Sequence, residues 1–401
     1  MKSDFHNTFM SDEMQIESAL RADKIKAIMN RDGLEAILVS SNVNIFYCSG
    51  RVFRGYVFFM PSAAKPLFFI IRPNTFEPSD SLIYIRKPEQ IVDILAERGI
   101  SIPARVGLEL DSLTYNEEVR IAKALGNPEI ANASSVLREA RLTKTPFEIE
   151  LMKVDGVHQA EAYRHIPALY RKDMTDVEFQ IEIERVLRRE GCLGYPRVAG
   201  QLMEINMGSL LCGDNADVPG PYDFAMGGGG VDPSLPGGAD GSIMRNATAV
   251  MVDMNGSFNG YQTDMTRVWS IGRLPDIALK AHECSRKILR TLEEIALPGV
   301  EVAELYRRAE AIAAEEGLEE YFMGHRQKAG FIGHGVGIEL NEQPPVTPRS
   351  KVRLQESMTL ALEPKFVIPH VGAVGVENTY VVRHDGLECI TIFPEEIQEL
   401  I

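Results

Sequence analysis

Four acidic residues and one histidine in this sequence are spaced in a way that could bind metal ions. Asp253 and Asp264 flank a turn-forming stretch with two Asn-Gly pairs, and apolar, β-branched runs lie on either side of it. This pattern is typical of a β-hairpin. A turn centred on Phe258-Asn259 would place the two aspartates directly opposite each other, with Cβ atoms roughly 4.5–5.5 Å apart. Buried carboxylates at that distance need a cation or a shared proton.

A second pair of acidic residues lies near the C-terminus. The apolar runs 359–363 and 374–382 read as two strands joined by a turn-forming segment. A turn centred on His370 would place Glu363 opposite Glu377. Two hairpins of this kind predict a cluster of four carboxylates.

His334 could add an imidazole to this cluster, since its glycine neighbours allow close approach of the backbone. Oxygen-rich ligands with one nitrogen suit pairs of Mn, Co, Fe or Zn ions better than a structural zinc. Taken singly, each residue also has an ordinary structural interpretation. A lone aspartate in a turn is usually a cap, and a lone histidine is usually a satisfied core residue.

The joint pattern resembles the M24 family of creatinase, aminopeptidase P, prolidase and methionine aminopeptidase, which has the pita-bread fold. The resemblance rests on the stretches DMNGSFNGYQTDMTR, GHGVG, ALEP and GVEN. It implies a metallohydrolase with two divalent metal ions, Mn²⁺ first and Co, Zn or Fe as alternatives, and a homodimer. The implied metal ligands are Asp253, Asp264, His334, Glu363 and Glu377.

Two metal ions about 3.5–4 Å apart can share a water molecule, lower its pKa and polarise a scissile carbonyl. The resemblance gives Glu363 two roles, as a metal ligand and as the acceptor of the proton from that water. Thr266 and Tyr261 are predicted to orient the ligand carboxylates. Simple packing within a strand is an equal alternative for both.

Four positions depart from the aminopeptidase P and prolidase pattern. Histidines of those relatives are replaced here by Gly220, Gly330 and Asn341, and an arginine is replaced by Gly375. Asn341 is predicted to be catalytic, because its amide could donate a hydrogen bond to a developing oxyanion, although it cannot carry a proton. His325 and His370 are possible substitutes, with a surface or structural role as the alternative.

Composition excludes some partners and predicts the compartment. A formal net charge of −15 argues against nucleic acid and anionic membranes as partners. The five cysteines are scattered and form no CxxC motif, which favours a reducing compartment. The first residues are too polar for a signal peptide, and the most apolar stretch, 56–71, contains two prolines and a lysine. The cytoplasm is therefore the expected location.

The 401 residues predict two domains of mixed α and β structure. Alternating strands and helices predict an α/β domain over residues 1–142, which also resembles the creatinase-type N-terminal domain. Residues 143–401 are expected to form the pita-bread domain. Capping boxes at Thr145 and Thr175 each predict the start of a helix. The glycine- and proline-rich segment 213–241 is expected to form a rim or lid.

Three functions remain open. The first is a metal-dependent peptidase that cuts an Xaa-Pro bond, of the aminopeptidase P or prolidase type. The second is hydrolysis of a small non-peptide C–N substrate, as in creatinase and ectoine hydrolase relatives. The third is a binding module without turnover, which the complete set of ligands disfavours.

Overall fold

The computed structural model describes residues 8–200 and 203–401 of the chain. The chain divides in sequence between Arg141 and Leu142 into two compact units. Within the described ranges, no helix combines the length and the apolar character that crossing a membrane requires.

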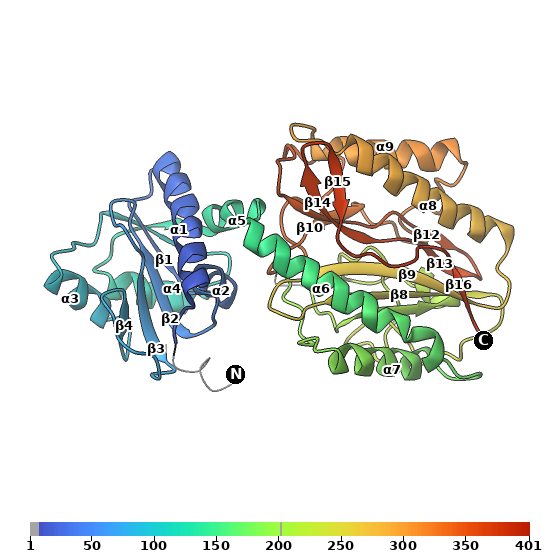
Figure 1. The fold of residues 1–401 in the computed structure, drawn as a ribbon, viewed down its shortest axis with the longest axis horizontal. Coiled ribbons are helices and arrows are strands. Elements are labelled where there is room, and N and C mark those ends of the chain that lie inside the picture. Colours follow the sequence, from blue (N-terminus) through green and yellow to red (C-terminus); the bar gives the residue numbers. More distant parts are fainter. Residues whose placement is uncertain (1–7, 201–202) are drawn as a thin grey trace. The chain divides into compact units, whose positions relative to one another are not determined.

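The N-terminal unit is built on one mixed sheet of six strands (Figure 1), in the order β4-β3-β2-β1-β5-β6. The central strand β1 pairs antiparallel with β2 and parallel with β5. The strands are β1 Ala36–Val39, β2 Arg54–Phe59, β3 Leu67–Arg72, β4 Leu82–Tyr84, β5 Arg105–Leu108 and β6 Glu129–Asn132. The helices are α1 Asp12–Asp32, α2 Asn42–Ser49, α3 Gln90–Glu97, α4 Tyr115–Ala124 and α5 Ser134–Leu142.

The predicted α/β domain is confirmed, with one local error. The segment after β1 was expected to form a strand and a turn, but it forms α2. The Ser41 side chain accepts a hydrogen bond from the Asn44 N–H at the start of this helix, and Gly50 ends it in the left-handed conformation. These two caps outweigh the strand preference of the apolar residues between them.

The C-terminal unit contains two four-stranded sheets and a separate two-stranded ribbon. The first sheet has the order β16-β9-β8-β7, the second has the order β10-β11-β14-β15, and β12 pairs with β13. The strands are β7 Gly208–Cys212, β8 Thr248–Gly256, β9 Thr263–Ile271, β10 Gly333–Gly335, β11 Thr359–Leu362, β12 Lys365–Ile368, β13 Gly372–Gly375, β14 Asn378–Arg383, β15 Gly386–Cys389 and β16 Gln398–Leu400.

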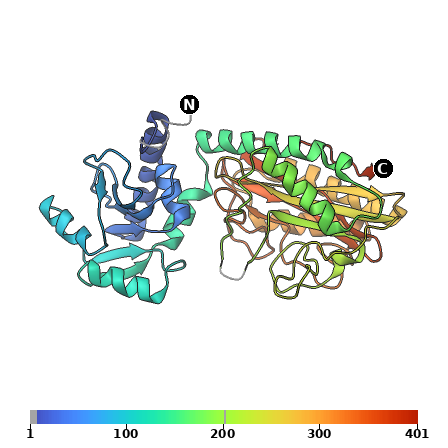
Figure 2. The same ribbon diagram turned by 90° about the horizontal axis from the view of Figure 1, so that it is seen from below.

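Two pairs of helices enclose these sheets (Figures 1 and 2). Helices α6 (Pro146–Arg164) and α7 (Asp176–Arg189) pack on the first sheet, and Tyr163, Phe179 and Trp269 belong to the apolar core between them. Helices α8 (Asp276–Ile295) and α9 (Val302–Glu315) share an apolar core with the second sheet and the ribbon. Strands β13 and β14 also contact β8 and β9, so the sheets meet between the two helix pairs.

Strands β8 and β9 form one long hairpin whose register differs from the prediction. Asp253 lies opposite Thr266, and Asn255 lies opposite Asp264. The prediction that the two aspartates are directly opposed is therefore wrong, because the turn is centred one residue later than expected. Asp264 therefore lies two residues along β9 from Thr266, the residue opposite Asp253. Because this separation is an even number of residues, both aspartate side chains still point to the same face of the sheet.

The register predicted for the second hairpin is confirmed. Lys365 lies opposite Gly375 and Leu362 lies opposite Asn378, which sets Glu363 across from Glu377. Each arm is interrupted at its glutamate, so the predicted pair of strands becomes β11 and β12 on one arm and β13 and β14 on the other. The two glutamates occupy the breaks.

Helix α6 starts at the predicted capping box, in which Thr145 and Glu148 bond to each other's backbone N–H groups. Farther along, it carries a fully buried aspartate, Asp155, which is 0% exposed. Burial raises the pKa of Asp155 to about 8, against an opposing effect of the Phe258 backbone. The carboxyl is therefore protonated in the folded protein at neutral pH.

This aspartate is expected to make stability depend on pH. Because the pKa of Asp155 is raised in the folded state, its contribution to stability is fully present below pH 3.8 and is lost as the pH rises through about 8. The stability of Asp155→Asn relative to wild type should therefore increase when the pH is raised from about 5.5 to about 8.5. At roughly 2–4 °C per kcal/mol, the difference in Tm should shift by several degrees, measurable by calorimetry. The exposed Asp23→Asn serves as the control, and an equal difference at both pH values would contradict the prediction.

Candidate metal centre

Strand alternation explains why both aspartates face the second sheet. In β8, Val250 and Val252 belong to the apolar core under α6 and α7, whereas Met251 belongs to the core shared with α8 and α9. Asp253 is two residues beyond Met251 and so lies on the same inner face. Asp264 reaches this face from β9 because it has the same parity as Val268, which is also a member of the second core.

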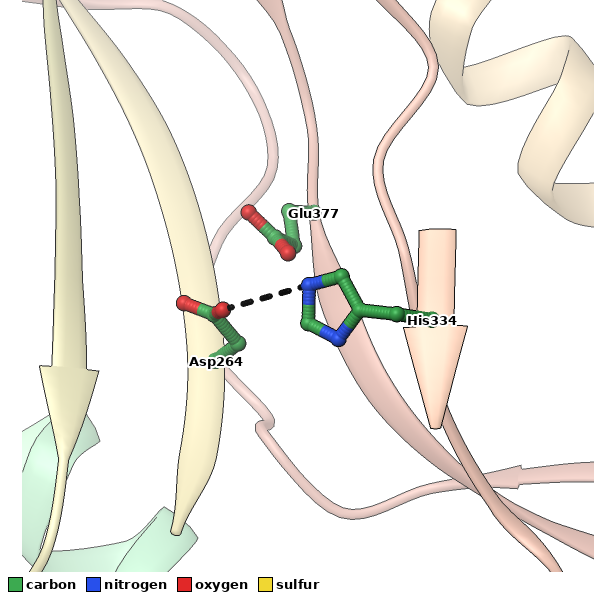
Figure 3. A group of neighbouring side chains, drawn as sticks. All are labelled: Asp264, His334 and Glu377. Carbon is green, nitrogen blue, oxygen red and sulfur yellow. Dashed lines mark ion pairs between the residues drawn. The ribbon is translucent and has the colours of Figure 1, made fainter. Parts of the chain in front are cut away.

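The structure brings the five predicted ligands together as two overlapping groups. Asp264, His334 and Glu377 form one group, and Asp253, Glu363 and Glu377 form the other. Within each group, one ligand atom per residue lies within 4.8 Å of the others. Figure 3 shows the first group, with the imidazole of His334 directed toward Asp264 and the Glu377 carboxylate beside them. His334 Nε2 is 3.9 Å from Asp264 Oδ2 and 3.6 Å from Glu363 Oε1.

A lysine that the sequence analysis did not single out lies in the second group. Lys365 Nζ donates to Glu363 Oε2 at 2.7 Å, to Asp253 Oδ2 at 2.8 Å and to Glu377 Oε2 at 3.1 Å. Its side chain is 0% exposed. The position of Lys365 two residues after Glu363 could have indicated this, because alternate residues of an extended chain point to the same face.

The electrostatics of the cluster are those of several acids in a largely buried space. Burial, then the neighbouring carboxylates, raise the pKa of both Asp264 and Glu377 well above the usual range. Burial lowers the pKa of Lys365, but attraction by Asp253, Glu363 and Glu377 outweighs it and leaves that pKa well above its ordinary value. One ammonium thus offsets part of the charge, and an added cation would offset more.

The residues of the first group fit a divalent metal ion. Glu377 Oε1 is buried and has no hydrogen-bond partner among the described residues. His334 Nδ1 lies 3.1 Å from the Gly335 carbonyl oxygen, an arrangement that leaves Nε2 facing Asp264 and Glu363. Carboxylate oxygens with one imidazole nitrogen are donors that Mn²⁺, Fe²⁺, Co²⁺ and Zn²⁺ accept.

Neighbouring side chains fix the ligands in place. Thr266 Oγ1 donates to Glu377 Oε2 at 2.7 Å, which confirms the predicted contact between this threonine and a carboxylate of the cluster. The Thr379 hydroxyl accepts from the Asp264 N–H and donates to the Asp264 carbonyl. The Tyr261 hydroxyl donates to Glu148 at 2.8 Å, so it joins the hairpin to the start of α6.

Asn341 has two hydrogen bonds to one backbone position. Its Oδ1 accepts from the Ala199 N–H at 2.7 Å, and its Nδ2 donates to the Ala199 carbonyl at 3.1 Å. Among the described residues, these bonds connect it to a loop and not to a member of the carboxylate cluster. Its catalytic role stays a prediction.

The other histidines considered as substitutes have partners in the segment after β7. His325 Nδ1 lies 2.9 Å from Asp217 Oδ2, and the exposed His370 lies 3.3 Å from Asp214 Oδ1.

The replacement of the expected arginine by Gly375 has a structural reason. Gly375 has φ of 144°, and a Cβ there would lie 2.7 Å from the Pro364 carbonyl oxygen. No larger side chain fits at this position without movement of the backbone.

Comparison with known proteins agrees with this architecture. Residues 150–384 match the model of metallopeptidase family M24, and residues 21–143 match that of the creatinase/prolidase N-terminal domain. An Xaa-Pro dipeptidase from Pyrococcus horikoshii is 24% identical over 381 residues, 94% of this chain and 98% of the relative. The uncharacterized peptidase YqhT of Bacillus subtilis is 22% identical, over 94% of this chain and 99% of its own.

Solved structures share the fold over nearly the whole chain. The Xaa-Pro dipeptidase from Bacillus anthracis has a TM-score of 0.78 at 21% identity, and the match covers 96% of this chain and 100% of that one. The prolidase from Pyrococcus horikoshii has a TM-score of 0.74 at 22% identity, over 95% of this chain and 99% of its own. The creatinase-like domain followed by a pita-bread domain is thereby confirmed.

Proposed function

Since this chain belongs to metallopeptidase family M24, we propose that it is a metal-dependent peptidase that cleaves Xaa-Pro bonds. The observation that carries the proposal is the buried cluster between the sheets of the C-terminal unit. We assign the metal centre to its four carboxylates and one imidazole, which come from Asp253, Asp264, His334, Glu363 and Glu377 and which form two overlapping groups.

A bound divalent ion would supply a Lewis acid for the substrate carbonyl and would lower the pKa of a nucleophilic water. The chain itself must accept the proton from that water. We assign this step to Glu363, whose Oε1 faces His334 while its Oε2 accepts from Lys365. Asn341 would have to release the Ala199 carbonyl before its amide could donate to a developing oxyanion, so we rank it second to Glu363.

The relatives named Xaa-Pro dipeptidase support a peptide substrate. A small non-peptide C–N substrate is the second candidate, because glycines stand at 220 and 330 and Asn341 is bound to the backbone. Our proposal includes Mn²⁺ as the preferred metal, a homodimer and a cytoplasmic location. The number of metal ions that the cluster can bind depends on Lys365.

Hydrolysis of a panel of Xaa-Pro dipeptides and tripeptides by Mn²⁺-loaded protein tests the proposal. We expect cleavage at the bond before proline and loss of activity on treatment with a chelator. Cleavage of dipeptides alone would indicate a prolidase, and cleavage of longer peptides an aminopeptidase P. Xaa-Ala peptides are the matched controls. If no peptide is cleaved while bound metal is confirmed, the small-molecule hydrolase becomes the better assignment.

A further inference from the structure

We propose that the ammonium group of Lys365 takes the place of one of two metal ions, so that the cluster binds a single divalent ion. That ion would be held by Asp264, His334 and Glu377, the group shown in Figure 3. The inference rests on the metal centre of the proposed function, but it does not depend on which substrate is cleaved.

The nitrogen of Lys365 lies where a second metal ion would have to bind. Lys365 Nζ lies 2.7–3.1 Å from one oxygen of Asp253, Glu363 and Glu377, which are all three members of the second group. A metal ion that used these oxygens at roughly 2.0–2.2 Å would have to lie within the volume of the ammonium group. The ammonium and a second ion therefore exclude each other.

The backbone of Lys365 is fixed within the fold. Its backbone N–H donates to Met323 Sδ at 3.4 Å, and its carbonyl accepts from the Met323 N–H at 2.8 Å. Its partner across the ribbon is Gly375. Because the side chain is 0% exposed, an ammonium withdrawn from the three carboxylates would be a buried charge without partners. Such a charge is strongly unfavourable.

The net charge of the cluster also favours a single ion. With all groups ionised, the four carboxylates carry four negative charges and the ammonium offsets one of them. A single divalent ion leaves the cluster one negative charge away from neutrality. A second ion beside the lysine would leave one excess positive charge in a buried space, so it would bring no gain in neutrality over a single ion. The first group still has unused acceptor capacity, since Glu377 Oε1 has no hydrogen-bond partner among the described residues.

Metal content tests the inference without reference to activity. Protein stripped with a chelator and reloaded with Mn²⁺ should contain one ion per chain by elemental analysis and by calorimetric titration. Its electron paramagnetic resonance spectrum should show the resolved hyperfine pattern of an isolated Mn²⁺ ion. A magnetically coupled pair would instead give a broadened spectrum.

Two substitutions of the lysine separate charge from volume. Lys365→Ala removes the ammonium and its aliphatic stem, so the Mn²⁺ content should rise to two ions per chain and the spectrum should be that of a magnetically coupled pair. Lys365→Met removes the charge but keeps most of the side-chain volume, so this variant should still bind one Mn²⁺ ion per chain. Lys280→Ala is the control, because this lysine pairs with Glu316 at the surface and should leave the content unchanged.

The outcomes distinguish the inference from the proposed function. Two ions in the wild-type protein would overturn the role of Lys365 and leave the metal centre intact. Failure to bind any Mn²⁺ would instead contradict the metal centre itself. If Lys365→Ala does not fold, the wild-type stoichiometry and the Lys365→Met variant still decide the question.

Discussion

Replacement of Asp264 by asparagine is expected to abolish both metal binding and hydrolysis while leaving the fold intact. Asp264 is a member of the first group, and its Oδ2 lies 3.9 Å from His334 Nε2. The amide keeps the shape of the side chain but removes the negative ligand. A loss of several kcal/mol of transition-state stabilisation corresponds to a fall in kcat/KM of at least about 10³.

Metal content, Xaa-Pro hydrolysis and thermal unfolding should be measured together on this variant. The repulsion described for the cluster predicts that metal-free Asp264→Asn is at least as stable as metal-free wild type, although it should lose the gain in Tm that Mn²⁺ produces. The exposed Asp385→Asn is the matched control and should retain both properties. Wild-type Mn²⁺ content in Asp264→Asn would remove this residue from the metal site.

The second large effect, on stability, is expected at Arg267, which stabilises the strands that carry the site. This arginine is 2% exposed. Its Nη1 donates to the carbonyls of Thr266 and Glu377, and its Nη2 donates to the Asn378 side chain. It also bonds to the carbonyls of residues 391, 393 and 394 in the C-terminal segment. One guanidinium therefore joins β9, the Glu377 backbone and the end of the chain.

Arg267→Met should lower the free energy of unfolding by roughly 3–5 kcal/mol, because it leaves several buried carbonyls without a donor. Denaturant unfolding of the metal-free protein measures this loss directly. The affinity for Mn²⁺ should also fall, by about 10–100-fold, since the Glu377 backbone loses its support. Arg273→Met removes an exposed arginine and should change neither quantity. An unfolding midpoint equal to that of wild type would contradict the structural role.

The clustering of the five proposed ligands could be predicted from the sequence even though one register was wrong. The turn after β8 was placed one residue early, which displaced the pairing of Asp253 and Asp264 by two residues. A displacement of two preserves the face of the sheet, whereas a displacement of one would have moved an aspartate to the opposite core. The parity of the strand positions was therefore enough to bring both aspartates into the same cluster.

The surroundings of the proposed ligands could not be predicted from the sequence. Lys365 was overlooked because a lysine in an apolar strand is normally expected at the surface, and only the tertiary fold shows that it is fully buried. The partners of Asn341 lie about 140 residues away in sequence, at a loop with no pattern of its own. Such contacts depend on packing between distant segments, which local periodicity does not encode.

Lys365 also has a consequence for the protein before any metal arrives. Its ammonium connects Asp253 of the first sheet with Glu363 and Glu377, which flank strands of the second sheet. Small metal-dependent folds lose their structure together with their ion. Here the ammonium of Lys365 connects the sheets, so we expect loss of the proposed ion and unfolding to be separate events. Metal-free protein would then stay folded, and we expect it to bind the proposed ion again without refolding.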